Sequence, residues 1–379
     1  MKIVKAEAFN IHFISNMVRD GEGHSHPGKP HDALWPMFVI TCDDGTEGYA
    51  IGGRMEVDIL NSVVAPAIIG EDPLMREKIW QRMRTWQRLH PAFTDRTLNA
   101  LDLALWDIAG KTAGQPVYKL LGGYRHEVPA YGSIMVGDNI PGGLDTPQAY
   151  ADYALKLVER GYKAIKLHTW MPPLIPKADP VLDIQACRMV REAVGPDIAL
   201  MLDPYHDYSR QEAYYLAKEL EKLDFLWLEE PMDENSIASY QWLQAKTKLA
   251  ICGPETAGGK VQNRAMWVTA NAADIGRAGT ETMGGITSVM KIVHLYEAYG
   301  MAVELHGGTI GNLHILGAMG IPGQYYERGM HHPLIDYEIP KPWFNSIYDP
   351  MDEEGMVPIP QTPGLGWDLN MEYILANRR

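Results

Sequence analysis

The chain has 379 residues, which is long enough for two structural units and too long for one small core. Its composition, 46% hydrophobic and 22% charged, is typical of a globular protein and excludes a disordered or fibrous chain. The formal net charge of -14 would repel a phosphate backbone, so nucleic acid is not expected as a partner.

The N-terminal sequence MKIVKAEAFNIHF alternates polar and apolar residues as a strand does, and it lacks the features of a signal peptide. No stretch approaches the length of a membrane span, so no membrane association is expected. The three cysteines, Cys42, Cys187 and Cys252, are far apart and odd in number, which predicts neither a disulfide framework nor a zinc site. Together these features predict a cytoplasmic protein.

The first part of the chain predicts an α+β unit over residues 1–125. Strands are expected at 2–13 and 36–51, with a turn at Asp43-Asp44-Gly45. Apolar periodicity then predicts helices over residues 55–69, 73–88 and 95–119.

Residues 16–32 between the two strands are rich in Gly, Pro and His without periodicity, which predicts a long loop of functional importance. We take His24, His26 and His31 in this loop as candidate substrate-binding residues, with the alternative that the loop is a surface segment without a role. Tyr205, close to the barrel strands described next, is a fourth candidate for substrate binding.

Short apolar runs alternate with helix-length segments over residues 126–339, which predicts a (β/α) barrel. The eight strand candidates are YGSIM, YKAIKLH, IALMLD, FLWLEE, LAICGPE, ADIGRAG, MAVELH and QYYERG. Four prolines in residues 170–180 exclude a helix and predict an enlarged loop at the C-terminal end of the second strand. The tail, residues 340–379, shows no helix or strand periodicity and is expected to pack back on the first unit.

Polar residues that can do chemistry close most of these apolar runs, and in a barrel such positions converge on one mouth. They are Lys166, His168, Asp203, Glu229, Glu255, His306 and Glu327.

Three of these residues, Asp203, Glu229 and Glu255, are spaced by 26 residues each, which is one βα unit and places them on consecutive strands. A single carboxylate at a strand end is often a solvated cap or half of an ion pair, but three at even spacing favour a hard cation such as Mg²⁺. Glu230 is the second choice to Glu229, because side chains alternate along a strand. A bound divalent cation would also let this acidic protein hold an anionic substrate.

Lys166 and His168 are two residues apart on one strand and therefore point the same way, which suits proton transfer. A metal and a second cationic group nearby are expected to lower the pKa of Lys166. His306 closes a run on the opposite side of the barrel. Two bases that face each other across a metal-bound carboxylate can remove the proton at the adjacent carbon and deliver a proton elsewhere.

The order of these residues, Lys-x-His, Asp, LEEP, GPE, GGIT, His and Glu, resembles the mandelate racemase branch of the enolase superfamily over the whole chain. The resemblance implies a (β/α)₇β barrel closed by an N-terminal α+β capping domain, one Mg²⁺ per subunit on Asp203, Glu229 and Glu255, and a homo-oligomer. It also implies that Lys166, His168 and His306 are bases and that Glu327 hydrogen-bonds the substrate carboxylate.

This chain departs from the family pattern at two places. His168 stands where the family usually has a second lysine, and Ala278 and Gly279 stand where it has an aspartate that holds the histidine. His306 thus lacks its expected partner, and Glu281, Glu304 or a water are the candidate replacements.

Within this family the polar 16–32 segment favours a dehydratase of aldonic or aldaric acids, which abstracts the C2 proton and eliminates the C3 hydroxyl to give a 2-keto-3-deoxy acid. Racemisation or epimerisation and lactone cycloisomerisation are the alternatives within the family. A protein that binds a metal and a sugar acid without turnover is the alternative of another class. Either the Lys166/His168 pair or His306 can be the abstracting base.

Overall fold

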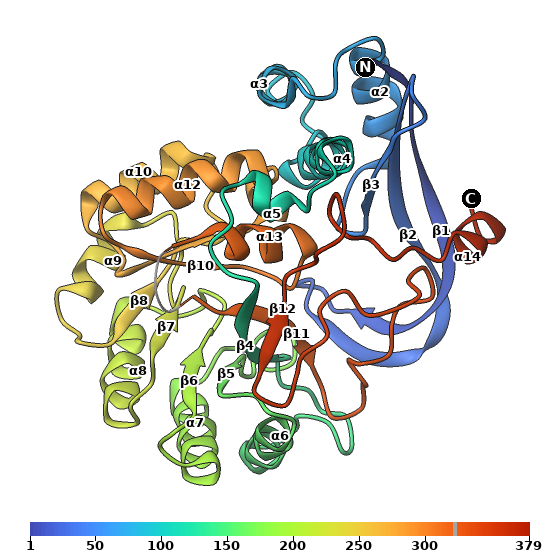
Figure 1. The fold of residues 1–379 in the computed structure, drawn as a ribbon. Coiled ribbons are helices and arrows are strands. Elements are labelled where there is room, and N and C mark those ends of the chain that lie inside the picture. The colour runs from blue at the N-terminus through green and yellow to red at the C-terminus, as the bar shows by residue number, and fades with distance from the viewer. Residues whose placement is uncertain (321–323) are drawn as a thin grey trace.

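The computed structural model describes residues 1–320 and 324–379. Figure 1 shows a barrel of strands and surrounding helices, a smaller unit with a long antiparallel ribbon, and a C-terminal tail that runs between them. In the described part of the chain no helix is long and apolar enough to cross a membrane.

The barrel is built from eight parallel strands in the order β10-β9-β8-β7-β6-β5-β4-β11. Tyr325, just before β11, donates its backbone N–H to Glu304 of β10 at 3.1 Å, so the two ends of this order come together. The strands are β4 (Glu127–Ile134), β5 (Ala164–Leu167), β6 (Ala199–Leu202), β7 (Trp227–Glu229), β8 (Ala250–Cys252), β9 (Ile275–Ala278), β10 (Ala302–Leu305) and β11 (Tyr326–His331). These strands coincide with the eight apolar runs, so the predicted barrel is confirmed.

Helices separate the strands and pack around the barrel (Figure 1). They are α6 (Pro147–Glu159), α7 (Pro180–Val194), α8 (Arg210–Lys222), α9 (Ile237–Gln244), α10 (Lys260–Ala270), α11 (Thr280–Met283), α12 (Ile286–Ala298) and α13 (Ile310–Ala318). Side chains cap several of their first turns, as Ser209 and Glu212 do reciprocally on α8. Residues 170–179 of the proline-rich segment contain no helix and lie between β5 and α7, as predicted, and Pro180 is the first residue of α7.

The N-terminal unit is an antiparallel sheet covered by helices. Its strands are β1 (Ile3–Arg19), β2 (Ser25–Cys42) and β3 (Glu47–Ile51). Its helical segments are α1 (Val57–Ile59), the π-helical turn Leu60–Val64, α2 (Ala65–Ile68), α3 (Arg76–Trp86), α4 (Asp95–Ala113) and α5 (Val117–Leu120). The predicted helix 95–119 is thus two helices, because Gly114 adopts φ 62° at the end of α4 and Pro116 follows.

The predicted long loop at 16–32 is wrong. β1 and β2 remain paired as far as Arg19 and Ser25, and only residues 20–24 form the turn, where Asp20 Oδ1 accepts the N–H groups of Glu22 and His24. The Gly and Pro residues of this segment do not form a loop because the segment pairs with a neighbouring strand. β3 pairs with β2 only from Met37 onward, so the part of β2 before Met37 has a free edge. Prolines in this part of β2 can lie on that edge, where no hydrogen bond from a backbone N–H is required.

The tail is not devoid of regular structure, contrary to the expectation from its sequence. It contains β12 (Met356–Pro358), antiparallel to the start of β4, and α14 (Met371–Ala376). Its last residues run beside β1, where Arg379 exchanges backbone hydrogen bonds with Asn10. Trp343 from the tail stacks on Trp35 of β2 with ring centroids 5.1 Å apart. These contacts hold the tail against the ribbon.

Asp102 on α4 joins the capping unit to the barrel. Its carboxylate accepts the backbone N–H of Thr287 at 2.9 Å and the hydroxyl of the same residue at 2.6 Å, at the first turn of α12. Burial raises the pKa of Asp102 to about 7.

Because the folded pKa of Asp102 lies above the ordinary value, its contribution to stability is present at low pH and is lost as the pH rises through about 7. We expect the difference in melting temperature between the wild type and Asp102→Asn to favour the wild type at pH 5.5 and to shrink by pH 8. Calorimetry at both pH values measures this difference, and a gap that widens with pH would contradict the assignment.

Candidate active site

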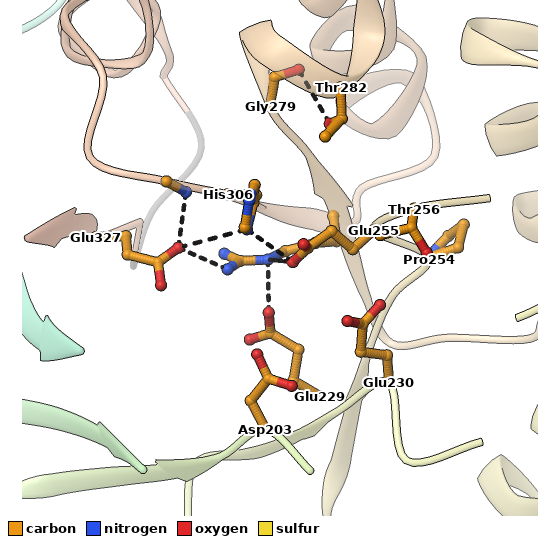
Figure 2. A network of polar contacts seen from close by, with 12 residues as sticks. Asp203, Glu229, Glu230, Pro254, Glu255, Thr256, Gly279, Thr282, His306 and Glu327 are labelled. Carbon is orange, nitrogen blue, oxygen red and sulfur yellow. Dashed lines mark hydrogen bonds and ion pairs between the residues drawn. The ribbon is translucent and has the colours of Figure 1, made fainter. Parts of the chain in front are cut away.

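The seven strand-end residues meet at the mouth of the barrel. Six of them are almost fully buried, and the His306 side chain is 34% exposed. They come from β5 (Lys166 and, just after it, His168), from the ends of β6 and β7 (Asp203, Glu229), from the segment after β8 (Glu255), from the end of β10 (His306) and from β11 (Glu327). Figure 2 shows the carboxylates from four different strands pointing toward one another.

Asp203, Glu229 and Glu255 each offer an oxygen, and these oxygens lie within 4.8 Å of one another. Glu229 is the member from the LEEP sequence. Glu230 is also buried, with φ 26°, but its Oε2 has no hydrogen-bond partner in the described structure, and its Oε1 lies 3.6 Å from His206. Burial and the carboxylates of Glu255 and Glu234 raise the pKa of Glu230 well above its usual range.

The segment that carries Glu255 is held by two residues that sequence reasoning missed. Glu234 accepts the backbone N–H groups of Glu255, Thr256 and Ala257, the last two at 2.7 and 2.8 Å. Arg264 donates to the carbonyl oxygens of Pro254 at 2.8 Å and Glu255 at 2.7 Å. No motif marks these residues, because they act on the backbone rather than on a ligand.

Lys166 lies among three carboxylates. Its Nζ is 3.2 Å from Asp203 Oδ2, 3.1 Å from Glu229 Oε1 and 3.1 Å from Glu327 Oε1. Burial and Arg277 disfavour the ammonium, but Glu229 and Glu327 outweigh them and raise the pKa of Lys166 well above its usual range. Among the side chains alone the carboxylates outnumber the cationic neighbours, so the expected lowering of this pKa depends on a bound metal and stays a prediction.

His168 lies beside Lys166 as predicted. Its Nε2 is 3.0 Å from Asp203 Oδ2, and its Nδ1 is 2.6 Å from the carbonyl oxygen of Ile134. Since a carbonyl oxygen only accepts, Nδ1 carries the proton. Burial opposes ionisation of Asp203, but Lys166 and His168 together hold its pKa well below the usual range.

Of the four predicted substrate-binding residues, the structure brings His24 and Tyr205 to the mouth. The Tyr205 ring lies 5.0 Å from that of His168 and 4.7 Å from that of His24, which stands at the tip of the β1–β2 ribbon. His26 is one step back on the ribbon and contacts Asp20 at 2.8 Å. His31 is exposed further along β2, with Nδ1 3.1 Å from the carbonyl oxygen of Lys29, and is not brought to the mouth.

A pocket of about 530 Å³ lies against the tip of the ribbon. Its lining includes Arg19 and Asp20 from the ribbon, Trp35 from β2, and Gly53 and Arg54 from the segment after β3. The volume suits a small molecule, and the lining mixes charged residues with the apolar Leu34, Trp35 and Pro36 and includes none of the seven residues at the mouth.

His306 lies on the other side of the mouth from Lys166. Its Nδ1 is 2.9 Å from Glu255 Oε2 and 3.8 Å from Glu327 Oε2. The replacements suggested from the sequence, Glu281 and Glu304, are not its partners; Glu304 accepts from the backbone of Tyr325 instead.

Arg277 of β9 is a charged residue at the centre of the site that sequence reasoning missed. Its guanidinium is fully buried and ion-paired with Glu229, Glu255 and Glu327. The signal was an arginine two residues before Gly279 in an otherwise apolar run, on the face that points into the barrel.

The comparisons with known proteins agree with this arrangement. Residues 31–122 match the model of the mandelate racemase / muconate lactonizing enzyme N-terminal domain, and residues 149–373 match that of the enolase C-terminal domain-like family. The solved structure of a D-glucarate dehydratase from Agrobacterium tumefaciens, complexed with magnesium, is 46% identical, with a TM-score of 0.97 and coverage of 100% of this chain and 99% of the other.

Two curated relatives cover most of both chains. The arabinonate dehydratase of Saccharolobus solfataricus is 28% identical over 88% of this chain and 89% of its own length. The D-galactarolactone cycloisomerase of Agrobacterium fabrum is 29% identical over 90% of each.

The assignment of Glu229 rather than Glu230 to the metal site can be tested directly. We expect Glu229→Gln to weaken Mg²⁺ binding by about 100-fold or more, since it removes one of the three predicted ligands, and Glu230→Gln to change it by less than about fivefold. Isothermal titration of metal-free protein with Mg²⁺ measures both. The reverse order of effects would make Glu230 the ligand.

The residues at the mouth, the strand order that brings them together and both matched domains lead to one conclusion: the chain is an enzyme of the mandelate racemase / muconate lactonizing enzyme family within the enolase superfamily.

Proposed function

We propose that the chain is a Mg²⁺-dependent acid-sugar dehydratase. The observation that carries the proposal is the placement of proton-transfer groups on two sides of a buried carboxylate triad, with Lys166 and His168 from β5 and His306 from β10. The 46% identical relative carries the name D-glucarate dehydratase and was solved with magnesium, which supports the same reaction class here.

The residues at the mouth fit a divalent cation. Among the described residues, four buried carboxylates (Asp203, Glu229, Glu255 and Glu327) face two basic side chains, Lys166 and Arg277, so negative charge is in excess. The triad offers only oxygen, the donor that Mg²⁺ prefers. When bound there, Mg²⁺ supplies positive charge against which a carboxylate substrate can develop further negative charge.

The chain's own residues then handle the protons. One base, His306 or the Lys166/His168 pair, takes the proton from C2, next to the substrate carboxylate. The electron pair left at C2 forms the double bond to C3 as the C3–O bond breaks, and an acid at the mouth gives the departing hydroxyl its proton, so that water leaves. The enol that remains takes up a proton at C3 and loses the proton of its C2 hydroxyl, which gives the 2-keto-3-deoxy acid.

The charged residues that line the pocket near the ribbon support a polyhydroxy acid as the substrate. Arg19 and Arg54 line this pocket together with Asp20, which offers donors and acceptors to hydroxyls and a cation to a second carboxylate. We therefore place D-glucarate and other aldaric acids first among the substrates to test, and aldonic acids second.

The test is a screen of the Mg²⁺-loaded protein against aldaric and aldonic acids with detection of 2-keto acid. We expect turnover of at least one acid and a loss of about 100-fold or more in both Lys166→Ala and His306→Asn, since each removes a proton-transfer group. His294→Asn, an exposed residue on α12, is the matched control and should keep full activity.

A different outcome would select one of the alternatives. Solvent deuterium that enters C2 without formation of 2-keto acid would replace dehydration by epimerisation, and turnover of a lactone alone would indicate the cycloisomerase reaction that the Agrobacterium fabrum relative is named for. Bound Mg²⁺ with no reaction on any substrate would favour a binding protein.

A further inference from the structure

Arg277 and His306 share the same two carboxylate oxygens. Arg277 Nε lies 3.3 Å from Glu255 Oε2, and its NH2 group lies 2.8 Å from Glu327 Oε2. His306 Nδ1 lies 2.9 Å from that Glu255 oxygen and 3.8 Å from that Glu327 oxygen, as ion-pair contacts without the alignment of a hydrogen bond. Each of the two oxygens therefore lies within 3.8 Å of both a fully buried guanidinium and the imidazole.

The carboxylates would not stay in these positions without a cation. Glu255 and Glu327 come from different strands and carry like charges in a buried site, where repulsion between them is poorly screened. The guanidinium is planar and rigid and can bridge several carboxylates at once, which an ammonium on a flexible stem does less well. Arg277 Nε also lies 2.8 Å from Glu229 Oε1. This single residue of β9 therefore contacts three carboxylates.

An aspartate at the end of β9 could not hold the imidazole here. A Cβ added to Gly279 would lie 2.7 Å from the carbonyl oxygen of His306 and 3.2 Å from its Cβ. The backbone of β9 thus approaches His306 too closely for any side chain at that position. The partner of Nδ1 has to come from elsewhere in the mouth.

We propose that Arg277 is a positioning residue for His306: it fixes Oε2 of Glu255 and of Glu327, and these oxygens hold Nδ1 of the imidazole. A carboxylate at Nδ1 keeps the proton on that nitrogen and leaves Nε2 as the base that faces the substrate. Arg277 thereby orients the imidazole through two carboxylates, whereas in a catalytic dyad an aspartate orients the histidine directly.

The activity readout for this inference rests on the proposed function, but a structural readout does not. We would determine crystal structures of Mg²⁺-loaded wild type, Arg277→Met and Arg277→Lys, and measure kcat and KM with D-glucarate, or with whichever acid the screen identifies. Arg191→Met is the matched control, since Arg191 donates to backbone carbonyl oxygens, among them those of Ile198 and Leu223, at the opposite end of the barrel.

We expect Arg277→Met to lower kcat by about 100-fold with less than about a fivefold change in KM, because the imidazole loses its orientation. Its His306 ring should turn so that Nδ1 leaves Glu255. Arg277→Lys, which keeps the charge, should lie between Arg277→Met and wild type, and Arg191→Met should lower the melting temperature without changing kcat.

An unmoved His306 ring or an unchanged kcat in Arg277→Met would overturn the inference. If Arg277→Met does not fold, the same two readouts on Arg277→Lys decide, with a displaced ring and a loss of about 10-fold or more in support and an unmoved ring against. If the wild type turns over no acid, the proposed function fails, and the position of the ring still tests the role of Arg277.

Discussion

Buried negative charge that exceeds the buried positive charge is the constraint on which the site depends. Lys166 and Arg277 each contact three carboxylates, yet they cannot neutralise the four that meet at the mouth. Removal of one partner from a buried ion pair destabilises the folded protein by roughly 3–5 kcal/mol, because the other charge stays buried without a partner. The site is thus ready for a divalent cation, and the same carboxylates determine the protonation and the orientation of the groups that would transfer protons.

The rest of the fold keeps these charges together and away from water. The barrel places Asp203 and Glu229 at adjacent strand ends, and Glu234 and Arg264 fix the backbone from which Glu255 projects. The capping unit sends the β1–β2 ribbon to the mouth, where His24 meets Tyr205. The tail packs on the ribbon and on the start of β4, so segments distant in sequence support one face of the barrel.

Sequence reasoning identified what depends on local pattern. Each of the seven strand-end residues, from Lys166 to Glu327 in chain order, closes an apolar run. They could therefore be assigned to the barrel mouth from the sequence alone. Features that depend on partners distant in the sequence could not be predicted. Pro and Gly suggested a loop at 16–32, because the sequence of that segment does not show that β1 pairs with β2 there. Arg277 was not singled out, because the three carboxylates that it contacts lie on other strands. The contact of His306 with Glu255 was also missed, because Glu255 had been assigned to the metal.

The most direct test of the account is anomalous diffraction from crystals soaked in Mn²⁺, a stronger scatterer than Mg²⁺ with similar preference for oxygen ligands. The account predicts one strong peak per chain within coordination distance of oxygens from Asp203, Glu229 and Glu255, with Lys166 and Arg277 still beside Glu327. A mouth without a peak, in which the two cations remain paired with the triad at every Mn²⁺ concentration, would contradict it.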